Sequence, residues 1–175
     1  KTMRYTWIDE YLMSKPAVTK DLKVEWNWIR YMIGGRMFAA VLLNGENKPY
    51  YINLKLDPAE GAFLRKQYSD IIPGYYASKL HWNSIKPDGA VPDELLKDML
   101  DKSYALILHG LSKKKQRELL ISTYCGLDCT HCSWKEPCSC QGCVSTNGMA
   151  FHCQNEPCPV AACAMEKGVL FCGEC

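Results

Sequence analysis

The residues of this chain that could do chemistry by type and spacing are its 11 cysteines, all of which follow residue 124. Three C-x-x-C pairs stand at 129/132, 140/143 and 172/175, and each can turn two thiolates toward one metal ion. Because tetrahedral zinc takes four such ligands, the spacing predicts two structural zinc ions. The expected metal ligands are Cys125, Cys129, Cys132, Cys140, Cys143, Cys158, Cys163, Cys172 and Cys175.

The assignment of these cysteines to the two ions stays open. We favour one ion between the first two C-x-x-C pairs, and a second ion that the last pair shares with Cys158 and Cys163. The pairs could also alternate between the ions, and Cys125, His131 or His152 could replace one of these ligands. All-thiolate sites leave no open position for a substrate, so we expect the zinc to be structural.

An iron–sulfur cluster is the alternative to zinc, because it also needs grouped thiolates. Cys125-x3-Cys129-x2-Cys132 has the spacing of the radical S-adenosylmethionine cluster motif. The 43 residues after Cys132 are too few for the barrel of such enzymes, which argues against radical chemistry. The alternative that remains is another iron–sulfur or redox enzyme.

The cysteine pattern also bears on the compartment. An odd cysteine count, closely spaced pairs and no recognisable secretion signal favour metal binding in the cytoplasm over a disulfide framework. The sequence has no run of about 18 apolar residues, so we expect no transmembrane helix and no membrane partner.

Charge and cysteine content divide the chain into two predicted domains, residues 1–118 and 119–175. The first carries 19 Lys and Arg against 14 Asp and Glu, whereas the second carries 2 against 5 and all the cysteines. The second has too few apolar side chains for a core of its own, so metal is expected to supply its folding energy.

In the first domain, Lys79, His81, Trp82 and Asn83 combine charge, stacking and hydrogen bonding in one short segment, which we expect to contact a ligand. The lysine-rich segment 113–117 makes nucleic acid a further candidate partner, beside an unknown protein or small ligand. No nucleophile or paired carboxylate accompanies His81, so we assign no catalytic residue and favour a binding role over an enzyme.

Strand patterns dominate the first domain. Aromatic and β-branched residues alternate with polar ones between Leu22 and Ile33, which predicts one strand. Gly34-Gly35 and Asn44-Gly45 are typical of hairpin turns and predict two further strands, from Met37 to Leu43 and from Tyr50 to Leu56. Tyr75–Ile85 adds one bent strand or two short ones, and the absence of helical crossovers among the first three indicates an antiparallel sheet.

Helix patterns flank these strands, the first of them near the N-terminus. An N-cap, a proline and a capping-box acid at 57–60 predict a second helix that buries Phe63 and Leu64. A longer third helix is expected between Pro92 and Gly110. The fold class is therefore α+β: an antiparallel sheet with helices packed on one face, plus a small metal-stabilised cysteine-rich domain.

Three segments of the first domain resemble the MmcQ/YjbR family, namely YINLKLDPAEGAFLRKQY, IPGYYASKLHWNSI and VPDELLKDMLDKSYALIL. The resemblance covers residues 3–118 and implies a CyaY-like fold, with helices on one face of an antiparallel sheet. It implies no general activity, although some members are described as DNA-binding.

Residues 122–175 resemble an uncharacterised microbial cysteine-rich domain that is thought to bind zinc. YCGLDC, CQGC and FCGEC carry this likeness, which implies no known reaction. Both domains together predict a non-catalytic binding protein with structural zinc, for a ligand, a protein or nucleic acid. The alternatives are an iron–sulfur or redox enzyme and a DNA-binding protein that acts through the first domain.

Overall fold

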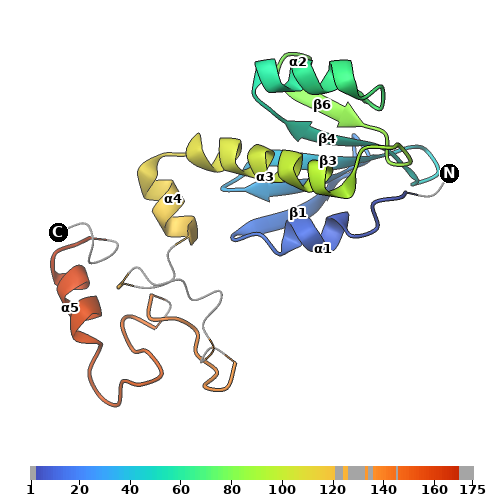
Figure 1. Ribbon diagram of the computed structural model, residues 1–175. Helices are drawn as coiled ribbons and strands as arrows, with labels where there is room; N and C mark the ends of the chain where they lie inside the picture. The colour runs from blue at the N-terminus through green and yellow to red at the C-terminus, as the bar shows by residue number, and fades with distance from the viewer. Residues whose placement is uncertain (1–2, 121–123, 126–132, 134–135, 145, 170–175) are drawn as a thin grey trace. The chain divides into compact units, whose positions relative to one another are not determined.

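The computed structural model describes residues 3–120, 124–125, 133, 136–144 and 146–169 (Figure 1). The chain forms two units, Lys1–Leu111 and Ser112–Cys175, and each is described by itself. The boundary expected after residue 118 lies inside a helix of the second unit, α4 (Lys113–Leu120). Within the described part of the chain, no helix combines the length and apolar character that a membrane span requires.

The first unit is built on one antiparallel sheet of six strands in the order β1-β2-β3-β4-β6-β5. Strands β1 to β4 follow one another as hairpins, whereas a helix and β5 separate β4 from β6 along the chain. This confirms the predicted antiparallel sheet and α+β class. The strands are β1 (Val18–Lys23), β2 (Trp28–Ile33), β3 (Arg36–Leu43), β4 (Pro49–Lys55), β5 (Ile71–Pro73) and β6 (Trp82–Ile85).

The stretch predicted as one strand from Leu22 to Ile33 is two strands joined by a tight turn, so that prediction is wrong. Lys23 pairs with Trp28 across the turn. Asn27 adopts a left-handed φ of 54°, which asparagine tolerates better than most residues. The alternation of Trp26 and Trp28 with polar residues looks the same in a strand and in this turn, so the pattern could not separate them.

Three helices of the first unit pack on the same face of the sheet (Figure 1). A row of paired residues runs across the sheet from Tyr31 on β2 to Asn83 on β6. Tyr31 bonds to Asp9 of α1 and Asn83 to Arg65 of α2, while α3 packs along β3 and β4. The helices are α1 (Ile8–Met13), α2 (Pro58–Gln67) and α3 (Asp93–His109).

Helix α2 begins as predicted but buries a different stripe. The Asp57 carboxylate accepts a 2.9 Å hydrogen bond from the Ala59 amide, which confirms the N-cap. Leu64 is buried, whereas Phe63 is 56% exposed, so the prediction that Phe63 is buried is wrong. The buried stripe contains Gly61 and Leu64, three residues apart on one helix face, and this turns Phe63 toward solvent.

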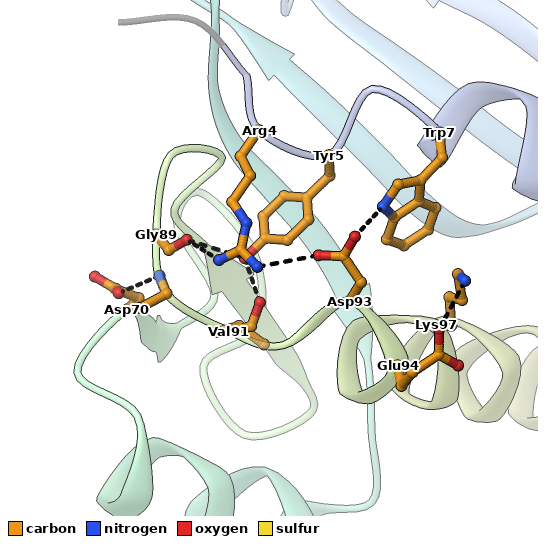
Figure 2. A network of polar contacts seen from close by, with 10 residues as sticks. Arg4, Tyr5, Trp7, Asp70, Gly89, Val91, Asp93, Glu94 and Lys97 are labelled. Atoms are coloured by element: carbon orange, nitrogen blue, oxygen red, sulfur yellow. Dashed lines mark hydrogen bonds and ion pairs between the residues drawn. The ribbon is translucent and has the colours of Figure 1, made fainter.

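A polar network ties the N-terminal segment to the start of α3 (Figure 2). The two oxygens of Asp93 accept hydrogen bonds from the Arg4 guanidinium (3.2 Å) and from the Trp7 indole (3.0 Å). Between them the buried Tyr5 hydroxyl donates to the Val91 carbonyl at 2.8 Å. The segment before α1 is therefore held in place by side chains that also hold the entry to α3.

The second unit contains helix α4 and, after a series of turns, helix α5 (Pro159–Glu166). Ala161 and Ala164 of α5 are buried, as is Cys143. Gly148 joins two cysteine-bearing segments through its backbone: its amide donates to the Cys143 carbonyl at 2.6 Å and its carbonyl accepts from the Cys158 amide at 3.0 Å.

Candidate functional site

The face of the sheet opposite the helices carries a cleft of about 630 Å³. Successive side chains of a strand point to opposite faces, so Trp82 lies on this side while its neighbour Asn83 faces α2. Five aromatic rings from the β1–β2 region, β4 and the segment 76–82 dominate its walls. We call this site the aromatic cleft; it is lined by Glu25, Trp26, Trp28, Met37, Tyr50, Tyr76, Ala77, Ser78 and Trp82.

One wall of the cleft is a pair of tryptophans that the β1–β2 turn positions. Trp28 is 5% exposed and packs on the sheet against Ala40 and Leu42, whereas Trp26 is 53% exposed. Their ring centroids lie 5.4 Å apart at an interplanar angle of 66°. Edge-to-face rings present their faces in different directions, so this pair offers a stacking surface on more than one side of a ligand.

The opposite wall is a loop, residues 74–81, that a buried polar ring fastens onto the sheet. The Tyr75 amide donates to the Ser84 hydroxyl at 2.8 Å, and this hydroxyl donates to the Asn53 side-chain oxygen at 2.5 Å. The Asn53 side-chain nitrogen then donates to the Tyr75 carbonyl at 3.1 Å, which closes the ring. Asn53 and Ser84 are fully buried cross-strand partners, so both backbone polar groups of Tyr75 are bound to the interior of the sheet.

The conformation of this loop is unusual at Tyr76. Its φ of 53° lies in the left-handed region, which is rare for a bulky side chain and costs roughly 1–3 kcal/mol. The ring contacts that of Tyr75, with centroids 4.5 Å apart, and is 78% exposed. A Cβ at the preceding Gly74 would lie 2.7 Å from Trp82, so the loop needs glycine there to approach β6. Strain of this kind is concentrated at functional sites.

Glu25 is the one charged residue among those that line the aromatic cleft. A hydrogen bond from its own backbone amide, together with the Lys23 ammonium, holds the pKa of the Glu25 carboxyl below its usual range. The Lys23 nitrogen lies 3.0 Å from a Glu25 oxygen and 5.9 Å from the centre of the Trp26 ring. The rim of the cleft therefore carries an ionised carboxylate beside an aromatic face.

The four residues predicted to contact a ligand lie in four different environments. Trp82 lines the aromatic cleft, and Lys79 lines an adjoining hollow that shares the loop from Tyr76 to Ser78. His81 is half-buried, and its carbonyl accepts a 2.9 Å hydrogen bond from the Leu56 amide. Asn83 is fully buried beneath α2. The structure thus brings Lys79 and Trp82 to one side of the sheet and turns Asn83 to the other.

Most residues of the aromatic cleft were not predicted as ligand contacts from the sequence. Glu25 and Trp26 looked like strand residues, and Tyr50 like the start of the third predicted strand. Asn53 offered the clearest clue, because a polar residue in the middle of a largely apolar strand is unusual unless a buried partner satisfies it. Ser84, paired with it across the sheet, is that partner.

In the second unit, a small cavity of about 160 Å³ brings together cysteines from three segments. The cavity is lined by Cys125, by the pair at 140 and 143, and by Cys158, with His152 beside them. The Tyr124 backbone amide donates a 3.3 Å hydrogen bond to the Cys143 sulfur. Backbone amides that point at a sulfur stabilise a thiolate.

The remaining predicted metal ligands are distributed as follows. Among the described residues, no three side chains of Cys, His, Asp or Glu form a group that could hold an ion. Cys163 is exposed on α5, and no disulfide joins the seven cysteines within the described ranges. Four predicted ligands lie outside the described residues: Cys129, Cys132, Cys172 and Cys175.

Comparison with known proteins places the first unit among relatives that have no assigned activity. The model of the YjbR family matches residues 13–106. The uncharacterized protein YjbR of Escherichia coli K12 is 31% identical over 112 residues, which is 64% of this chain and 92% of that protein. The uncharacterized protein YbdF of Escherichia coli O157:H7 is 34% identical over 90 residues, 51% of this chain and 71% of its own length.

A solved structure supports the same grouping. The crystal structure of Deinococcus radiodurans protein DR2400, with family-model domain DUF419, superposes with a TM-score of 0.58 at 29% identity. The match covers 64% of this chain and 84% of that one.

Proposed function

The chain belongs to the YjbR family, and from that premise we propose that its first unit is a non-catalytic binding module whose ligand enters the aromatic cleft. The observation that carries the proposal is the convergence of five aromatic rings, from segments up to 56 residues apart, on one hollow of the sheet face opposite the helices of the first unit. The volume of about 630 Å³ falls within the usual range for small-molecule sites.

The exposure of the rings supports a binding role. Trp26 and Tyr76 are 53% and 78% exposed, although burying such side chains would be favourable. On the surface of soluble proteins in general, contiguous exposed apolar side chains of this kind mark interaction sites. The left-handed backbone at Tyr76 supports the same proposal, because strain of this kind is concentrated at functional sites.

The chemistry of the lining favours binding over catalysis and a small ligand over nucleic acid. The cleft lining includes one serine, Ser78, and one carboxylate, Glu25, but no hydrogen bond joins the two, so the Ser78 hydroxyl is not paired with a base. The Glu25 carboxylate would repel a phosphate backbone. Lys79 lies at the edge of the loop and could still contact an anion, so nucleic acid is an outcome that the experiment tests.

The experiment uses Nile red, a neutral aromatic dye whose fluorescence rises in apolar sites, with the full chain. We expect saturable binding that Trp26→Ala weakens about tenfold, since stacking on one aromatic ring contributes roughly 1–3 kcal/mol. Phe63→Ala is the matched control, because Phe63 is equally exposed but lies on α2 over the other face. Equal dye affinity in both variants would contradict the proposal. Binding of a single-stranded oligonucleotide that weakens steeply with salt would favour the nucleic-acid alternative.

We propose a second function for the second unit, a structural zinc site. The supporting observation is that Cys125, Cys140, Cys143 and Cys158 line one cavity, with an amide directed at the Cys143 sulfur. No three of the described side chains stand close enough to hold an ion, so zinc binding would require these thiolates to turn into the cavity. This proposal differs from our preferred pairing, which placed Cys158 with the last C-x-x-C pair. A closed thiolate site holds the chain together without presenting a position for substrate, and a reducing cytoplasm would keep its thiolates available.

A further inference from the structure

The charge of the aromatic cleft narrows the class of ligand, if the cleft is the binding site proposed above. Its lining combines five aromatic rings with one charged residue, the Glu25 carboxylate. Aromatic faces carry negative potential and attract cations, and a carboxylate adds to that attraction. Anionic ligands are disfavoured by the same arrangement.

The chain already holds one cation against these two groups. The Lys23 ammonium lies 3.0 Å from the Glu25 carboxylate and 5.9 Å from the Trp26 ring centroid. Lys23 is not among the residues that line the cleft, so its contact with Glu25 and Trp26 lies at the rim of the cleft. The geometry therefore accepts a positive charge between carboxylate and ring, and a cation entering the cleft would compete with Lys23 for both.

We infer that the aromatic cleft binds a small molecule with a quaternary ammonium group, which lies between the tryptophan and tyrosine rings and the Glu25 carboxylate. A primary ammonium needs several hydrogen-bond acceptors when it leaves water, and this lining is mostly apolar. A quaternary ammonium donates no hydrogen bond and is the cation that aromatic cages recognise. The cleft is larger than such a group alone, so the ligand carries an apolar or aromatic extension.

The test compares choline with its neutral carbon isostere, dimethylbutanol, by following the tryptophan indole resonances of the full chain in NMR titrations. Both probes have the same shape and differ only in charge. We expect choline to bind about tenfold more tightly, a ratio that corresponds to one moderately desolvated cation–π and charge contact. Equal affinities would overturn the inference.

Two variants and their matched controls locate the effect. Glu25→Gln should weaken choline binding about tenfold and leave dimethylbutanol unchanged, while Lys23→Gln should strengthen choline binding several-fold by removing the competitor. The ion pair between Lys48 and Glu46 in the β3–β4 turn has nearly the same geometry, 2.8 Å, outside the cleft. Glu46→Gln and Lys48→Gln should therefore leave choline affinity unchanged. Equal effects of the two carboxylate variants would overturn the inference.

The outcomes separate this inference from the proposed function. If Nile red depends on Trp26 while choline and dimethylbutanol bind alike, the cleft binds ligands but does not select cations. If Trp26→Ala leaves Nile red affinity unchanged, the proposed function itself is contradicted. A trimethyl-lysine peptide that binds more tightly than choline would overturn the assignment to a small molecule and identify a protein partner.

Discussion

The backbone amide of Tyr75 donates a 2.8 Å hydrogen bond to the fully buried hydroxyl of Ser84, and this contact fixes the cleft loop to the sheet. The same hydroxyl donates a hydrogen bond to the side-chain oxygen of Asn53, and the side-chain nitrogen of Asn53 donates one to the Tyr75 carbonyl. One serine therefore serves both the interior of the sheet and the wall of the binding site.

Ser84→Ala should destabilise the fold by about 1–3 kcal/mol, because it leaves a buried Asn53 oxygen and the Tyr75 amide without their partner. Urea denaturation measures the change in the free energy of unfolding. Nile red affinity should fall as well, since the loop loses its attachment. Ser69→Ala, at an exposed serine of the same unit, should change neither quantity. Unchanged dye affinity in folded Ser84→Ala protein would show that the ring does not position the cleft.

Asn27→Ala should destabilise the β1–β2 turn by about 1–3 kcal/mol, because alanine is unfavourable at positive φ and cannot replace the side-chain bonds. Asn27→Gly loses the same bonds, to the Asn44 carbonyl and to Asn47, but accepts the backbone conformation. The difference between the two variants in thermal or urea unfolding isolates the backbone contribution. Equal destabilisation would mean that the left-handed conformation costs nothing here.

Alkaline stability should depend on Tyr31. Burial, and then its 2.7 Å hydrogen bond to the Asp9 carboxylate, raise the pKa of this phenol above its usual value. Its contribution is complete below pH ~10, where the unfolded phenol is also protonated, and is lost as pH rises above that value because only the unfolded chain ionises. The loss should be about 1.4 kcal/mol for each pH unit above ~10.

Tyr31→Phe should therefore be less stable than the parent at neutral pH but lose less stability between pH 9 and 11. Urea midpoints at several pH values measure both slopes. Tyr76→Phe, at a ring that is 78% exposed, is the control for loss of a phenol. Parallel slopes for the parent and Tyr31→Phe would contradict the prediction.

Metal removal should unfold the second unit and spare the first. We expect about two equivalents of zinc by elemental analysis, and chelation should release amide protection in the second unit, residues 112–175, only, because structural zinc supplies most of the folding energy of such a small domain. Iron with sulfide and an absorption band near 400 nm would instead identify an iron–sulfur protein.

The proposed cavity site predicts which cysteines share an ion. Cys143→Ser and Cys158→Ser should each lower the zinc content by about one equivalent, and the double variant should lose no more than either alone. Cys138→Ser is the control, because Cys138 is exposed and does not line the cavity. Loss of two equivalents of zinc in the double variant would show that Cys143 and Cys158 bind different ions.

Local features of the first unit were predictable wherever one stretch of chain decides its own backbone. Asp57 and Pro58 begin α2, Pro92 and Gly110 bound α3, and the Gly34-Gly35 turn has positive φ at both residues. Caps, prolines and turn glycines act through nearby atoms, so the sequence alone shows them. The turn at Asn27 escaped prediction because its tryptophans repeat the alternation of a strand.

By itself, the sequence determined the antiparallel α+β fold, the family to which the chain belongs and the cysteine pattern that suggests metal. Only the tertiary structure decided which sheet face the helices of the first unit cover, and it separated Trp82, in the cleft, from Asn83, beneath α2. Period-two alternation distinguishes two faces but does not say which one helices will cover. The cleft joins Glu25 to Trp82 through strand register and one buried polar ring, and such long-range contacts have no local pattern in the chain.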